Sequence, residues 1–409
     1  MNQLQMLKTA LIAYVNSVKE VWSVVAHPLS IFSKRKGTVK DYRIYGNSVQ
    51  DGTPTHEEPI EVQSVGELVT EGKYAEKYKV PVTVRGKNFI NKDNITITPR
   101  NRRFYEKNGD LITIQGNEGA SQYASSGGTL ALEFPKTLPS GTYTFSIYVT
   151  LLEEGIWGTG MRIYANNSYL FSYSSNTVGL RKKIKGTYSA ENGFSSLVIR
   201  LNGCKWLIEV DTLQVENGDT ATDYEPYVEP QTVNIYLDEP LRKVVYPAQG
   251  WTFADLIEFE RKKAIRNVYK EYITSVRNKS SNNGTTSVFF SDITKKPWFE
   301  TNRGVCISDK FIQHRAVYAN LKNTDGYIQP YITSSKENAV AYTFKGTDAT
   351  LTVQEAQELI GDGFEVCYAL GKPIEVDIDL PKLPQFKGTT IYEVQTEVPP
   401  SGIEVCYIA

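Results

Sequence analysis

The feature that most constrains the fold is a series of short segments between residues 91 and 227 in which apolar and polar residues largely alternate. These segments are 95–98, 111–114, 130–134, 143–149, 161–164, 197–201 and 206–210, and Gly, Asn, Ser and Pro separate them. Alternation places successive side chains on opposite faces of a strand. Many short strands with regular turns are typical of a sandwich or jelly roll. The sequence therefore predicts a mainly β chain with a jelly-roll-like β-sandwich.

Length and turn residues suggest how the chain divides into domains. With 409 residues and about 150 residues in a typical domain, about three domains are expected. Pro226 and Pro230 mark a connector after the sandwich. We expect an N-terminal helical segment at 1–37, a small β connector domain at 38–90, a jelly-roll domain at 91–229 that folds alone, and a C-terminal β-rich domain with one short helix at 230–409.

The N-terminal segment carries a heptad pattern. Its apolar seam consists of Leu4, Leu7, Leu11, Tyr14, Val18, Val21 and Val25. This spacing predicts an amphipathic helix that ends before Pro28. Ile12, Val15 and Trp22 widen the apolar face, which favours a bundle of more than two helices or docking onto another protein. We expect oligomerisation through the seam, with a homotrimer favoured; the alternative is a helix packed on its own domain.

The C-terminal region contains one helix signal and a short internal similarity. The segment from Thr352 to Ile360 is predicted to be a helix that ends at Gly361. Thr352 would be its N-cap, and Glu355 would complete a capping box. Residues 363–368 and 402–407 match at five of six positions. Six residues are too few for a solenoid repeat, so we expect two strands with equivalent inside–outside alternation.

Composition excludes several functional classes. The chain has three His, four Cys without a Cys-x-x-Cys spacing, and a net charge of −1. These counts argue against zinc sites, a disulfide scaffold and most His-dependent catalysis. A near-neutral chain also lacks the broad basic field that nucleic acid attracts. We expect no metal site, no cofactor and no nucleic-acid partner.

The apolar stretch from Ala10 to Phe32 is interrupted by Asn16, Ser17, Lys19 and Glu20. A membrane helix needs about 20 predominantly apolar residues, and no small-residue cleavage site follows, so neither membrane insertion nor a secretory signal is expected. Cys204, Cys306, Cys367 and Cys406 lie mostly in strand-like segments. We expect reduced, buried thiols.

The acidic and nucleophilic residues form no recognisable catalytic motif. The sequence contains no Gly-x-Ser-x-Gly elbow, phosphate loop or His-Glu-x-x-His. Glu153 and Glu154 are adjacent and would face opposite ways on a strand. Asp377 and Asp379 would share a face, where a solvated strand surface is the simpler interpretation. We therefore expect a non-catalytic protein without catalytic residues.

One stretch combines aromatic rings with hydrogen-bonding groups in the way that sugar sites do. The candidate carbohydrate-binding residues are Trp157, Arg162, Tyr164, Asn166, Asn167, Tyr169 and Tyr173. Trp157 lies among glycines, which suggests an exposed loop. The three tyrosines have an alternative interpretation as core or edge residues of strands. Trp206, in an apolar strand, is expected in the core.

Several segments resemble minor structural and tail-tip proteins of bacteriophages that infect Gram-positive bacteria. They are 42–55 running into 59–66, then 80–89, 213–227, 386–394 and the closing 403–407. The resemblance implies a virion component, usually at the baseplate or in a fibre. The segment 213–227 also looks like the last strand and exit of a carbohydrate-binding-module-like jelly roll, and such modules offer a concave sheet or rim loops to glycans.

We therefore expect a tail, baseplate or fibre protein that attaches to host surface glycans. Its expected partners are other virion proteins, further copies of itself and a host cell-surface glycan. It would be assembled in the host bacterial cytoplasm and act at the host surface. One alternative is a purely architectural virion subunit of the baseplate, collar, head decoration or fibre, without glycan binding. A weaker alternative is a glycan depolymerase.

Overall fold

The computed structural model describes residues 30–32, 38–117, 128–155, 159–201, 203–246, 250–279, 286–300, 303–313, 326–332, 338–345, 351–394 and 396–408. The seam at residues 4–25 and Trp157 lie outside the described residues. Strands dominate what is described, and they form sandwich-like layers. The predicted mainly β fold is confirmed.

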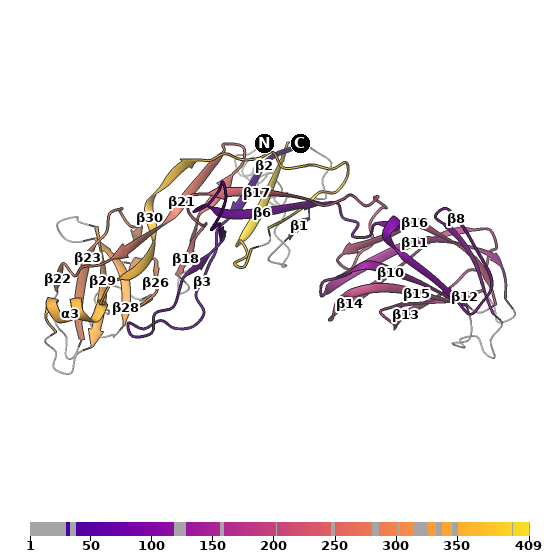
Figure 1. Ribbon diagram of the computed structural model, residues 1–409, viewed down its shortest axis with the longest axis horizontal. Coiled ribbons are helices and arrows are strands. Elements are labelled where there is room, and N and C mark those ends of the chain that lie inside the picture. The colour runs from indigo at the N-terminus through magenta and orange to yellow at the C-terminus, as the bar shows by residue number, and fades with distance from the viewer. Residues whose placement is uncertain are drawn as a thin grey trace, which may run out of the picture. The chain divides into compact units, whose positions relative to one another are not determined.

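The chain forms two compact units (Figure 1). The first, here called the sandwich unit, comprises residues 84–231 and 384–391. The second, the discontinuous unit, comprises 1–83, 232–383 and 392–409. Residues 38–83 share one unit with residues 232–383 and 392–409, although the sequence analysis placed them in separate domains. The physical reason is strand pairing, because β2 (Thr38–Tyr45) pairs with β32 (Gly402–Ile408) and β20 (Leu256–Glu258).

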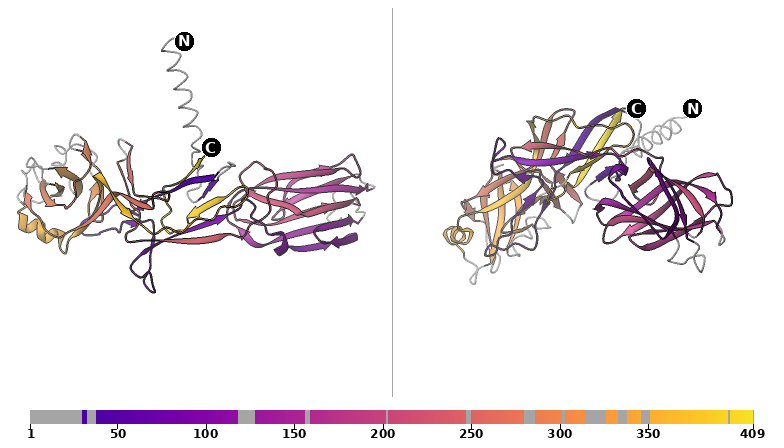
Figure 2. Two further views of the ribbon diagram at one scale, coloured as in Figure 1. Left: turned by 90° about the horizontal axis from the view of Figure 1, so that it is seen from above. Right: turned by 45° about the vertical axis from the view of Figure 1, so that its right-hand side comes forward.

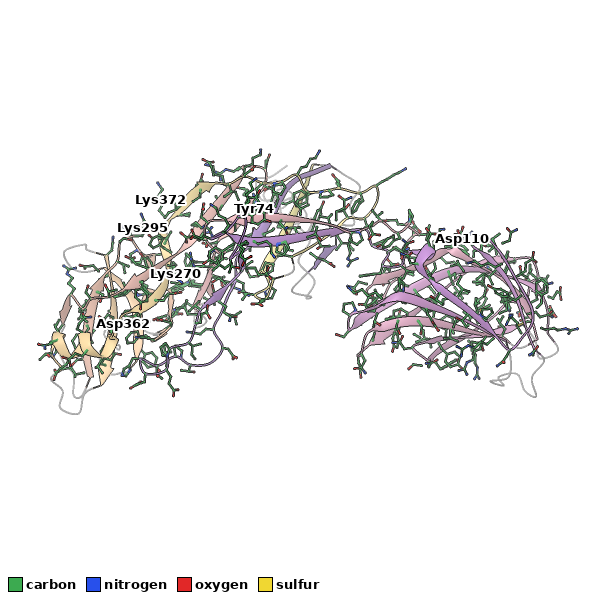
Figure 3. The ribbon with its side chains drawn as sticks, viewed as in Figure 1. Tyr74, Asp110, Lys270, Lys295, Asp362 and Lys372 are labelled. Atoms are coloured by element: carbon green, nitrogen blue, oxygen red, sulfur yellow. The ribbon has the colours of Figure 1, made fainter. Side chains whose placement is uncertain are left out.

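The sandwich unit consists of two five-stranded antiparallel sheets, whose strands run side by side in Figure 2. The front sheet has the order β13 (Ser168–Ser174), β12 (Gly160–Ala165), β15 (Phe194–Leu201), β10 (Gly128–Leu138) and β7 (Thr96–Arg100). The back sheet has the order β14 (Arg181–Ala190), β11 (Gly141–Glu153), β16 (Lys205–Asn217), β9 (Leu111–Gly116) and β8 (Arg102–Asn108). Asp110, labelled in Figure 3, lies in the β8–β9 turn. It pairs at 2.7 Å with Lys92 of the 3-10 helix η1 (Lys92–Asn94).

The inward faces of the two sheets form one apolar core, as the alternation predicts. Phe145, Ile163 and Trp206 are each at most 1% exposed. The indole N–H of Trp206 donates to the sulfur of Cys204 at 3.2 Å, so its polar edge is satisfied inside the core. The expected core position of Trp206 is confirmed.

The discontinuous unit is built from several sheets. The six-stranded sheet has the order β26 (Cys306–Ser308), β30 (Phe364–Asp377), β21 (Lys263–Ile273), β20, β2 and β32. A five-stranded sheet has the order β22 (Asn278–Lys279), β23 (Thr286–Asp292), β29 (Asn338–Lys345), β28 (Tyr327–Ile332) and β27 (Ile312–Gln313). A further sheet joins β1 (Ser30–Phe32), β31 (Ile391–Val394), β6 (Tyr78–Arg85), β17 (Gln231–Leu237) and β5 (Glu67–Leu68). Three two-stranded sheets pair β18 (Lys243–Tyr246) with β19 (Trp251–Ala254), β3 (Ser48–Val49) with β4 (Gln63–Ser64), and β24 (Phe299–Glu300) with β25 (Arg303–Gly304).

The predicted C-terminal helix is present as α3 (Val353–Ile360). The hydroxyl of Thr352 accepts from the backbone N–H of Glu355, and the Glu355 carboxylate accepts from the backbone N–H of Thr352. Gly361 ends the helix at φ 58°, a conformation that favours glycine. The predicted capping box and stop are confirmed.

The two similar hexapeptides begin equivalent strands of the six-stranded sheet. Phe364 in β30 and Ile403 in β32 are both buried, and the glutamates that follow them are half-buried. The shared pattern is limited to these two positions, because Val366, Cys367 and Tyr368 are all buried in β30. Cys204, Cys306 and Cys367 are buried as expected, and burial raises the pKa of the Cys367 thiol to about 12.

Candidate functional site

Strand alternation decides which side chains face outward on the front sheet. In β12, Met161 and Ile163 are buried in the core, so Arg162 and Tyr164 point to the opposite face. Antiparallel register places Arg162 directly opposite Arg200 of β15. The same alternation therefore brings Arg200 to the outer face.

These residues form a compact cluster with Tyr169 of β13. The guanidinium carbon of Arg200 lies 4.2 Å from the ring centroid of Tyr164, and that of Arg162 lies 5.5 Å from the ring centroid of Tyr169. The two tyrosine rings meet edge to face at 5.7 Å. Such cation–π and edge-to-face contacts hold the rings and guanidinium planes in place. We call Arg162, Tyr164, Tyr169 and Arg200 the aromatic–arginine face.

The face has an apolar floor and an exposed ring. Tyr164 packs with Ala131 and Val198 in a small cluster on the outer side of the sheet and is only 8% exposed. Tyr169 is 54% exposed, and its hydroxyl lies 3.1 Å from that of Ser172. A ligand approaching this face would meet the Tyr169 ring first, with the two arginines beside it.

A two-residue hairpin turn places Tyr169 beside Tyr164. Asn166 and Asn167 connect β12 to β13 with φ 47° and 67°. Positive φ at both central residues is the signature of a type I′ turn, which Asn accommodates. The turn pairs Ala165 with Ser168 and so sets Tyr164 opposite Tyr169, and a register shift lies just beyond this pair, where Ile163 is opposite Phe171.

The side chain of Asn166 is occupied by the protein itself. Its amide nitrogen donates to the carbonyl of Gly193 at 2.7 Å. Its amide oxygen accepts from the backbone N–H groups of Ser195 at 2.9 Å and Ser196 at 3.2 Å. Asn166 therefore joins two turns of the sandwich, while Asn167 is exposed at the tip of the hairpin.

Tyr173 faces the opposite way from Tyr169. It packs against the core, with its ring centroid 5.9 Å from that of Trp206, and burial raises its pKa. Of the sequence-predicted residues, the structure thus brings Arg162, Tyr164 and Tyr169 together and places Tyr173 inside. Arg200 was not predicted, although the alternating run 197–201 contains the signal, since Arg200 occupies an outward position among buried leucine and isoleucine residues.

The outer face of the back sheet carries the chain segment that leaves the sandwich. The Glu216 carboxylate accepts from the backbone N–H and the hydroxyl of Thr222, each at 2.7 Å. The ammonium of Lys183 donates to the Thr222 carbonyl at 2.7 Å. Gln214 accepts from the backbone N–H of Glu225 at 2.7 Å. The polar residues of the exit segment 213–227 are therefore used to hold that segment on the sheet.

Two of the four acidic residues considered for catalysis are paired with lysines. Glu153 lies 2.8 Å from Lys205, and Asp377 lies 2.9 Å from Lys263. Within the described ranges, no group of three or more His, Cys, Asp or Glu residues is arranged to hold a metal ion. None of the helices in the described part of the chain is long and apolar enough to cross a membrane.

The discontinuous unit offers two lesser candidates. The Trp298 ring packs against Trp251 and Phe253, with ring centroids 5.0 and 4.7 Å apart respectively. A hollow of about 260 Å³ is lined in part by Lys243 and Gln50, whose amide donates to the Ser308 carbonyl at 2.9 Å. The rings therefore contact one another, and the Gln50 amide already has a partner within the protein.

No protein-family model matches the chain, and no curated protein matches it. Among solved structures, part of the chain is similar to a candidate sugar-binding protein from Bacteroides thetaiotaomicron, with 12% sequence identity and a TM-score of 0.21. The similarity covers 38% of this chain and 94% of that protein. A TM-score this low supports no inference about function.

Proposed function

We propose that this chain is a non-catalytic component of a bacteriophage virion that attaches to glycans on the host cell surface. The observation that carries the proposal is the exposed ring of Tyr169 beside the guanidinium groups of Arg162 and Arg200. A pyranose has apolar C–H faces and polar edges, so its site needs apolar area next to oriented polar groups. The aromatic–arginine face offers both on adjacent strands.

The proposed contact is weak in a single copy. Stacking on an aromatic side chain is worth about 1–3 kcal/mol for a nucleobase, and a sugar gains the lower end or less. Linked copies that engage one surface together raise avidity by about 10²- to 10⁴-fold. The heptad seam expected at residues 4–25 would supply these copies as a homotrimer, so assembly and adhesion would act together.

The virion assignment rests on the sequence resemblance, above all on segments 42–55 and 213–227. In this proposal other virion proteins hold the chain at the baseplate or in a fibre, and the sandwich unit faces the host. Electron microscopy of virions that carry a label on this chain would show where in the particle it lies.

The test is binding of the purified full chain to a glycan array and to host cells. Tyr169→Ala should lower binding by about fivefold, since one stacking contact worth about 1 kcal/mol is lost, with a nearly unchanged melting temperature because Tyr169 is 54% exposed. The matched control is Tyr148→Ala on the back sheet, where the Arg181 guanidinium lies 3.7 Å from the Tyr148 ring centroid. This control removes a similar pair from the other face and should leave binding intact.

Two outcomes would contradict the proposal. Equal loss of binding in both variants would show that the front sheet has no special role. A chain that binds no glycan and no host cell, yet co-assembles with other virion proteins, would establish the architectural alternative.

A further inference from the structure

We infer that the sugar bound on the aromatic–arginine face carries an oxyanion, a carboxylate or a phosphate, which Arg162 and Arg200 bind together. This inference rests on the proposed function and specifies its ligand class. It starts from the register of the front sheet rather than from any single side chain.

Residues that lie opposite one another on neighbouring strands form rows across the front sheet. One such row crosses all five strands on the outer face. From β13 to β7 the row consists of Ser172, Arg162, Arg200, Thr129 and Arg100. Three of the five positions carry a guanidinium, and the other two carry a hydroxyl. Since arginine keeps its charge at any physiological pH, this row is a band of positive charge.

The neighbouring row contains no carboxylate. It consists of Tyr169, Tyr164, Val198, Ala131 and Thr98. Glu133 enters in the row after that, opposite Ser196. Ser196 is four residues from Arg200 along β15, so Glu133 lies roughly 13 Å from the arginine row at the usual rise of a strand.

Two like charges directly opposite each other on neighbouring strands oppose folding. Arg162 and Arg200 are such a pair, and both are half-buried, so water screens them less than it would at the surface. An anion bound between the two guanidinium groups would offset this repulsion. The register pair therefore indicates the charge of the ligand.

The orientation of the guanidinium groups fits the same ligand. Arg200 lies over the Tyr164 ring at 4.2 Å and Arg162 over the Tyr169 ring at 5.5 Å. A guanidinium held on a ring face still presents its N–H edge, and that edge forms paired hydrogen bonds with carboxylate or phosphate oxygens. The hydroxyls of Ser172 and Thr129 flank the arginines and supply donors for the sugar hydroxyls.

The test uses an array of one hexose in neutral form, as its uronate and as its phosphate, with the full chain. We expect the anionic forms to bind about 10- to 100-fold more tightly than the neutral form, the range that hydrogen bonds to charged groups provide. The preference should shrink as salt rises. The uronate and phosphate spots, with free inorganic phosphate as competitor, distinguish the two oxyanions and a free ion from a sugar-linked one.

Arg200→Gln should remove most of the anionic preference, so that the anionic and neutral forms of the sugar bind within about threefold of each other. The control is Arg181→Gln on the back sheet, whose guanidinium is bound by Glu209 at 2.7 Å and which should keep the preference. If Arg200→Gln does not fold, the preference and salt dependence of the unaltered chain still decide the question.

Equal binding of neutral and anionic sugars, still sensitive to Tyr169→Ala, would overturn the inference and leave the proposed function standing. Absence of binding to every sugar would instead overturn the proposed function. Competition by inorganic phosphate alone, without sugar binding, would show an ion site and also overturn the inference.

Discussion

The carboxylate of Glu225 accepts two hydrogen bonds from Thr389, a residue 164 positions further along the chain. The backbone N–H of Thr389 lies at 2.9 Å and its hydroxyl at 3.0 Å. Lys87 completes the arrangement at 3.1 Å from the same carboxylate. This contact joins segments 213–227 and 386–394 and helps to place residues 384–391 in the sandwich unit.

Replacing Glu225 should destabilise the protein more than replacing a surface acid. The Lys87 side chain is 8% exposed, so Glu225→Ala leaves a largely buried ammonium without its carboxylate and should cost about 1–3 kcal/mol. Urea unfolding measures this free energy. The control is Glu153→Ala, a 54% exposed partner of Lys205, for which about 0–1 kcal/mol is expected. Equal losses of unfolding free energy in the two variants would show that the Glu225 contact stabilises the protein no more than a surface ion pair does.

The bounds of the sandwich affect how a fragment should be cut. A fragment of residues 91–229 lacks Asn88, whose amide oxygen accepts from the backbone N–H groups of Ile90 and Val215, each at 3.1 Å. It also lacks Ile90, which is 2% exposed in the core. We expect the fragment 84–231 to melt at least several degrees higher than 91–229, as scanning calorimetry would measure. Identical melting temperatures would show that residues 84–90 add nothing.

The interior strands could be predicted from the sequence, but most edge strands could not. Every strand of the sandwich unit that sequence alternation missed, β8, β13 and β14, lies at the edge of its sheet. Edge strands carry charged and polar residues that discourage pairing with other chains, and β14 begins with Arg-Lys-Lys. From sequence alone such a composition predicts a loop, because the strand that pairs with it is not known.

The candidate site was partly predictable for a related reason. Composition indicated the stretch that holds Arg162 and Tyr169, whereas Arg200 is brought there only by the pairing of β12 with β15. The domain bounds depended on the same kind of information. Pairing of β2 with β32 joins residues near the two ends of the chain, and no local pattern encodes it.

Asn166 should matter for folding and Asn167 should not. Asn166→Ala removes the hydrogen bonds to Gly193, Ser195 and Ser196 and puts alanine at positive φ, so we expect about 2–4 kcal/mol of destabilisation. Asn167→Gly keeps the turn because glycine adopts φ 67° readily. Thermal melts of the two variants give the comparison. A tolerant Asn166→Ala would mean that the turn is held by strand pairing alone.

Alkaline pH should weaken the six-stranded sheet through Tyr45. Burial and the hydrogen bond to Glu404, at 2.8 Å, raise the pKa of Tyr45 to about 12. A raised pKa means that the folded state holds this proton more tightly, so its stabilising contribution is complete below pH 10 and is lost between about pH 10 and 12. Tyr45→Phe should reduce the fall in urea midpoint over that interval. An unchanged pH dependence would assign the effect to other tyrosines.

The final prediction connects assembly with adhesion. Leu11→Asp together with Val18→Asp places charges in the expected seam and should convert a homotrimer into a monomer, as light scattering would measure. Binding to a soluble monovalent sugar should keep its affinity, because the aromatic–arginine face lies in the sandwich unit. Binding to whole cells should fall by about 10²- to 10⁴-fold, because only linked copies gain avidity. An unchanged mass would mean that the seam does not join copies of this chain. A monomeric unaltered chain would instead indicate that the seam docks onto a different virion protein, and cell binding by the isolated chain would then be as weak as binding to a single sugar.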